Sequence, residues 1–177
     1  MRLFNQINNP ENKIYYKIVT FSRNPFFFRS CNIQDNFEGR FELLVLHLSL
    51  ILWIMKTKEN NEILTQNLID RFFEDMDASL RELGVSDLSV GKKIKVLAEK
   101  FYGRLTSYSD GFENIYKNNK TELLSKSIRK NLYLVNNVKR NLSYEKKISE
   151  KIQTIIVQSK GKLNQLDDLL NQDILKI

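Results

Sequence analysis

The sequence is poor in residues that break helices and in residues that carry metal or redox chemistry. Its 177 residues include two prolines, six glycines, one cysteine and one histidine. The single cysteine, Cys31, cannot form a disulfide within the chain, which favours a reducing compartment. The lone His47 provides neither a second histidine for haem nor the cysteine and histidine set of a zinc site. The scarcity of proline and glycine favours long helices.

The sequence also lacks an apolar run long enough to cross a membrane. Its most apolar stretch, Leu43 to Met55, would be about 20 Å long as a helix, whereas a bilayer core needs about 30 Å. Glu42 precedes the run, His47 interrupts it and Lys56 ends it. The run begins too far from the N-terminus for a secretory signal, and we expect no export. We predict a buried central helix from about residue 40 to 56; the alternative is a helix at a membrane interface.

Elsewhere apolar residues recur at helical spacing, and no segment alternates like a strand. We therefore predict one all-α domain over residues 1–177, with about six to eight helices around the central helix and a basic helical part from about residue 117. One helix is expected to begin at Pro10, behind Asn9. A second carries a stripe from Leu64 to Leu83. The remaining stripes are Val90–Ile94–Leu97–Phe101, Leu124–Ile128–Leu132–Val135, Tyr144–Ile148–Ile152–Ile155 and Leu163–Leu166–Leu169–Leu170.

Four residues are expected to have structural roles. Gly84 follows a long leucine stripe, where a residue in the left-handed conformation would end the helix. Asp87 and Gly91 lie where the next helix starts, which Ser86 or Ser89 can cap. His47 could in principle be a general base, but on so apolar a helix we predict a hydrogen-bonded core histidine.

Short motifs do not predict an enzyme. Asp70, Glu74, Asp77 and Arg81 recur at three- and four-residue steps, opposite the leucine stripe. A solvated helix face explains them best, a partner surface comes second and a metal site last. Val90-Gly91-Lys92-Lys93 resembles a phosphate loop, but its glycine spacing and following residue are wrong. We predict no catalytic residue, no metal, no cofactor and no small-molecule substrate.

The net charge of +7 is concentrated in the second half of the chain. Residues 1–91 have ten Lys and Arg against twelve Asp and Glu, whereas residues 92–177 have eighteen against nine. Nucleic acid, anionic lipid or an acidic protein would be attracted to this half. Codon drift in an AT-rich genome is an alternative, since lysine and asparagine are both abundant. The candidate surface for an anionic partner comprises Lys126, Arg129, Lys130, Lys146 and Lys147.

One long segment resembles a known family. FEDMDASLRELGVSDLSVGKKIKVLAEKFYGR, residues 73–104, is similar to the signature of the ubiquinol–cytochrome c chaperone family, of the alphaproteobacterial type. Ser22 to Phe26 and Gly39 to Leu43 agree in order and spacing, so the resemblance extends from about residue 12 to 104. Ser86 departs from the glycine that bacterial relatives often have. Without a long N-terminal extension, the chain is expected to be bacterial.

The resemblance implies an assembly chaperone for the respiratory cytochrome bc complex that binds newly made cytochrome b. It implies a protein at the cytoplasmic face of the inner membrane (the mitochondrial matrix in eukaryotic relatives). Further expected partners are the ribosome or an anionic membrane surface, but not DNA. The alternative function is a small basic RNA- or ribosome-binding module. The candidate client surface comprises Asp70, Glu74, Asp77, Arg81, Lys92, Lys95, Tyr102 and Arg104.

Overall fold

The structure is a computed structural model that describes residues 9–56, 61–134 and 144–159. Within these residues it contains helices and turns but no strand, which confirms the all-α prediction. The predicted stripe at residues 163–170 lies outside the described residues, and so does Val135, the last member of the stripe that begins at Leu124. The elements are α2 (Pro10–Ser22), α3 (Pro25–Arg29), α4 (Phe37–Lys56), α5 (Glu62–Glu82), α6 (Asp87–Asn118), α7 (Glu122–Ile128), the π-helical η1 (Arg129–Leu134) and α8 (Tyr144–Ser159).

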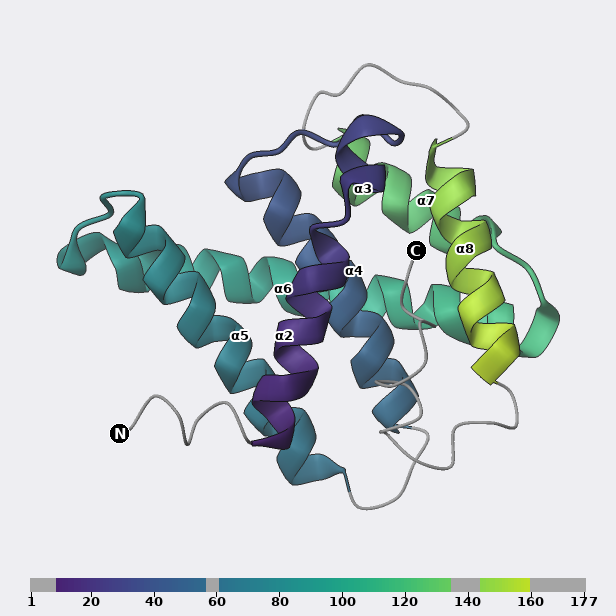
Figure 1. The fold of residues 1–177 in the computed structure, drawn as a ribbon, viewed down its shortest axis with the longest axis horizontal. Helices are drawn as coiled ribbons and strands as arrows, with labels where there is room; N and C mark the ends of the chain where they lie inside the picture. Colours follow the sequence, from purple (N-terminus) through teal and green to yellow (C-terminus); the bar gives the residue numbers. More distant parts are fainter. Residues whose placement is uncertain (1–8, 57–60, 135–143, 160–177) are drawn as a thin grey trace.

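The apolar helix α4 forms the centre of the fold. Every residue from Phe41 to Met55 is buried, because α2, α6 and η1 pack around the helix (Figure 1). The helix begins before the predicted start at about residue 40, since the side chain of Asn36 accepts a hydrogen bond from the Gly39 N–H at 2.8 Å and caps the first turn. Gly39 is required here because a Cβ would overlap the Gln34 carbonyl. No helix of the described residues is long and apolar enough to cross a bilayer.

Helices α5 and α6 form a hairpin whose turn projects from the body of the molecule, at the left of Figure 1. The turn has the hydrogen bonds of a Schellman motif. Gly84 N–H donates to the Arg81 carbonyl at 2.9 Å, and Val85 N–H donates to the Leu80 carbonyl at 3.0 Å. Gly84 has a φ of +82°, which confirms the predicted left-handed conformation. The hairpin is held together by contacts among the rings of Phe72, Phe73 and Phe101.

Helix α6 crosses the whole molecule and continues beyond its predicted stripe to Asn118. It ends at Asn119, whose φ of +56° is left-handed. Near that end α7 lies very close to α6, since a Cβ on Gly111 would be 2.9 Å from the Cα of Leu124. The stripe that begins at Leu124 was predicted to belong to one helix, but its described members are divided between α7 and the π-helical η1. Periodicity does not distinguish these two forms, because both bury its apolar members.

Candidate functional site

The outer face of α5 carries the acidic residues of the predicted client surface. Their carboxylates have local partners: Gln66 donates to Asp70 at 2.7 Å, and Arg71 lies 3.4 Å from Glu74. Arg81 pairs with Asp77 at 2.6 Å and also with Asp87, so that it links the two helices of the hairpin. No group of three metal-ligating side chains occurs in the described residues. This face is a solvated, ion-paired surface open to a partner.

The α6 members of the predicted client surface lie in different environments. Lys92, Lys95 and Tyr102 are exposed. Arg104 is not, because its side chain turns inward to Glu42 on α4 and is only 11% exposed. It was predicted as part of the client surface; the structure places it inside, where it compensates a buried carboxylate. We therefore remove Arg104 from the candidate surface.

A groove lies beside the projecting hairpin, between the first turns of α4, the end of α5 and the first half of α6. We call it the hairpin groove; its volume is about 570 Å³. Its floor includes the buried residues Phe41, Leu80 and Leu97. Three lysines lie along the α6 side. The lining comprises Phe37, Glu38, Phe41, Glu42, Leu80, Leu83, Val85, Lys92, Lys93, Val96, Leu97 and Lys100.

Large apolar side chains are exposed around this groove and at the tip of the hairpin. Leu88 is 92% exposed, Leu83 63% and Val96 49%. Leu83 and Val96 line the groove itself. Leu88 and Val96 were not predicted as site residues because both lie off the buried stripe of α6. Leu83 was predicted as the last member of the apolar stripe of α5, but it is exposed because it follows the end of that helix. The signal that could have identified Leu88 and Val96 is an apolar residue on the lysine-rich face of an amphipathic helix.

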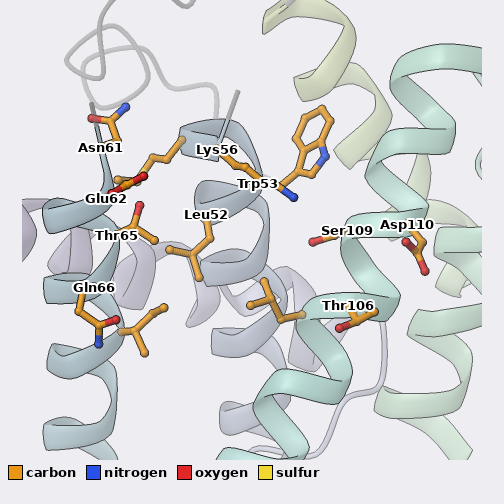
Figure 2. A pocket seen from close by; sticks show the side chains of 13 residues that line it. Leu52, Trp53, Lys56, Asn61, Glu62, Thr65, Gln66, Thr106, Ser109 and Asp110 are labelled. Atoms are coloured by element: carbon orange, nitrogen blue, oxygen red, sulfur yellow. The ribbon is translucent and has the colours of Figure 1, made fainter. Parts of the chain in front are cut away.

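A second hollow, of about 890 Å³, lies at the opposite end of α4 (Figure 2). Leu52, Trp53 and Ile69 contribute apolar surface, whereas Glu62, Thr65, Gln66, Thr106, Ser109 and Asp110 make much of its lining polar. The Trp53 indole N–H donates to Glu113 at 3.2 Å, which holds the ring between α4 and α6. The larger polar share of its lining makes this hollow less suited to an apolar client than the hairpin groove.

Comparison with known proteins identifies the family to which this fold belongs. The model of the family described as ubiquinol-cytochrome C chaperone matches residues 29–175. The chain belongs to this chaperone family. A crystal structure of the Cbp3 homolog from Brucella abortus is similar, with a TM-score of 0.74, 27% sequence identity, and coverage of 90% of this chain and 84% of that one. No curated protein matches the chain.

The match confirms the family that residues 73–104 suggested, and it continues far into the basic half, where the sequence resemblance was weak. The hairpin of this chaperone lies wholly inside the matched region. Of the residues predicted to meet an anionic partner, Arg129 is half-buried and the other four are exposed: Lys126, Lys130, Lys146 and Lys147. Lys146 lies 3.8 Å from Glu150, so part of its charge is compensated locally.

His47 lies in the core of the chaperone, as predicted. Its Nδ1–H donates to the Leu43 carbonyl at 2.7 Å, which assigns the Nδ1-protonated tautomer because a carbonyl can only accept. Burial lowers the pKa of His47 from 6.5 to about 4, and the ring packs edge-on against Phe27. A neutral imidazole enclosed in this way has no access to a substrate.

Gly91 and Asp87 were both predicted to have structural roles, but only Asp87 makes contacts that support one. Gly91 is exposed in α6 and nothing lies within 4 Å of a Cβ at this position, so no contact requires a glycine there. The structural role expected for it has no basis in the described contacts. Asp87 is the first residue of α6 and pairs with Arg81 across the turn. Its carboxylate also lies at the positive end of the helix dipole.

Proposed function

We propose that this chaperone binds newly synthesised cytochrome b and holds it during assembly of the cytochrome bc complex, at the cytoplasmic face of the inner membrane. Family membership supports the assembly role. The observation that carries the binding step is the group of exposed apolar side chains, Leu83, Leu88 and Val96, on a projecting hairpin inside the matched region. Exposed apolar surface of this kind favours association with another apolar surface.

The residues available to the proposed function suit binding rather than catalysis. A holding chaperone needs surface and shape, whereas a hydrolase or transferase needs a nucleophile and base in hydrogen-bond reach. The histidine is enclosed in the core, and burial raises the pKa of the Cys31 thiol to about 11, which makes it a poor nucleophile. Neither group is available to a bound client.

The test is a strain that lacks the gene, complemented with an affinity-tagged copy of the full chain. We expect the deletion to lose assembled bc complex on native gels and in haem b spectra, and the tagged chain to recover pulse-labelled cytochrome b. A membrane subunit of another respiratory complex serves as the control for nonspecific recovery. Normal bc complex in the deletion strain, or equal recovery of the control subunit, would refute the proposal.

A second candidate function is an RNA- or ribosome-binding module. The observation in its favour is the exposure of Lys126, Lys130, Lys146 and Lys147 on the last helices. The two functions depend on different regions of the chain. Charge reversal in α7 and η1 should abolish the activity of an RNA-binding module, whereas changes in the hairpin should abolish that of a client-binding chaperone.

A further inference from the structure

The hairpin groove combines an apolar lining with a one-sided charge. Lys92 and Lys93 line it from one turn of α6 and Lys100 from about two turns further along, while Glu38 is the exposed acid on the opposite wall. None of the three lysines forms an ion pair within the described residues. The second acid in the lining, Glu42, is already paired with Arg104. Lys100 lies close enough to Glu42 to lower the pKa of that carboxyl, so the uncompensated positive charge of the groove is that of Lys92 and Lys93.

The apolar part of the groove is also exposed to solvent. Leu83 and Val96 are 63% and 49% exposed although they border a floor of buried side chains. The walls are supported from behind by the turn at Gly84 and by the Glu42–Arg104 pair, so the groove is formed in the free chain. A preformed apolar groove loses less conformational entropy on binding than one that must be ordered.

Together these features define the chemistry of an occupant. We propose that the hairpin groove binds a short apolar segment of the client that carries acidic side chains along its edges. Apolar residues of this segment would cover Leu83 and Val96, while its carboxylates meet Lys92 and Lys93. This is the mode in which an amphipathic segment lies in a groove, with charge complementarity setting its orientation. The inference rests on the proposed chaperone function and specifies its binding site.

A defined peptide tests the groove directly. The probe is a fluorescein-labelled leucine- and alanine-rich peptide with glutamates flanking its leucine face, and the matched probe has lysines in place of the glutamates. Fluorescence anisotropy with the full chain measures affinity at roughly 50 and 300 mM salt. We expect the glutamate peptide to bind at least roughly tenfold more tightly than the lysine peptide at low salt, and the difference to shrink at high salt.

Variants of the chain assign the binding to the groove. Val96→Glu, and Lys92→Glu with Lys93→Glu, should each weaken binding of the glutamate peptide roughly tenfold. Val157→Glu is a matched control, because Val157 is 44% exposed on α8. Lys117→Glu with Lys120→Glu provides the control for charge reversal at two exposed lysines that belong to neither candidate surface. Circular dichroism melting shows that each variant is folded.

Several outcomes would overturn the assignment. Equal binding of the two peptides removes the charge argument, and equal losses in groove and control variants remove the location. If the chain dimerises and Val96→Glu abolishes the dimer, the occupant of the groove is a second copy of the chain. If the groove variants selectively lose binding to anionic vesicles, the occupant is a lipid surface. If Val96→Glu loses the peptide but restores bc assembly in the deletion strain, the groove inference fails while the chaperone proposal stands.

Discussion

Arg104 and Glu42 form a bidentate ion pair that joins α6 to the central helix α4, although the two residues are 62 positions apart in the sequence. The Nε and Nη2 atoms of Arg104 each lie 2.5 Å from a carboxylate oxygen of Glu42. Both side chains are largely buried, at 11% and 4% exposure. Burial raises the pKa of Glu42, and Arg104 acts in the opposite direction. The pair fixes the wall of the hairpin groove to the core.

Removing one partner of this ion pair should lower the stability of the fold more than removing both. Arg104→Leu leaves a carboxylate buried without its cation, and we expect it to lower the free energy of unfolding by about 3–5 kcal/mol. Glu42→Leu combined with Arg104→Leu should lose considerably less, because no unpaired charge remains. Urea unfolding of the single and double variants measures the difference. A double variant as unstable as Arg104→Leu would contradict this account.

The same variant should show a pH dependence of defined sign. Without Arg104, the pKa of Glu42 rises further above its ordinary value of 4.5, so the folded chain retains a proton that the unfolded chain releases. The stability loss of Arg104→Leu should therefore grow as the pH rises above about 4.5. Melting temperatures between pH 4 and 8 measure it, and a loss that is independent of pH would exclude a buried carboxylate.

His47 should make the chaperone less stable in mild acid. Its pKa is about 4 in the folded chain, below the ordinary 6.5, so protonation favours the unfolded chain. Stability should fall as the pH decreases from 6.5 toward 4, at up to about 1.4 kcal/mol per pH unit from this group. His47→Gln should flatten this part of the profile and retain bc assembly in the deletion strain. A folded His47→Gln variant that fails in assembly would instead indicate a functional imidazole.

Gly84 and Gly91 should respond oppositely to substitution. Gly84→Val places a β-branched side chain at a φ of +82° and should cost about 1 kcal/mol or more. Gly91→Ala, in an exposed turn of α6 with open space around it, should leave stability unchanged or raise it by about 0.5–1 kcal/mol. Thermal melting of the two variants compares them under identical conditions. Equal melting temperatures would remove the requirement for a left-handed residue at position 84.

The basic half should give a weak, salt-sensitive association with anionic liposomes or ribosomes. Lys126→Glu, Arg129→Glu and Lys130→Glu together should reduce co-sedimentation, because each basic side chain at an anionic surface contributes about 1 kcal/mol. The same reversal at Lys92, Lys93 and Lys95, which are exposed on α6, is the matched control. Binding that persists at about 300 mM salt and in the first variant would leave the lysines as solvated surface residues.

The sequence by itself determined the helical class, the buried central helix and the turn at Gly84. These features follow from local signals: an apolar run bounded by charges, a period of three to four residues, and a glycine at the end of a stripe. The family was also recognisable, because a match over the whole of residues 73–104 is specific. Helix ends were less accurate, since the Asn36 cap and the π-helical η1 depend on atoms that periodicity does not describe.

Only the tertiary structure decided which charged and apolar residues face a partner. Arg104 and the surface lysines look alike in the sequence, yet one is paired in the interior while Lys92 and Lys93 border a groove. Val96 has an apolar side chain of the kind usually found in a core, but it remains half-exposed. The physical reason is that burial and pairing are set by contacts between α4, α5 and α6. Residues 62 positions apart decide each other's environment there, and no local pattern contains that information.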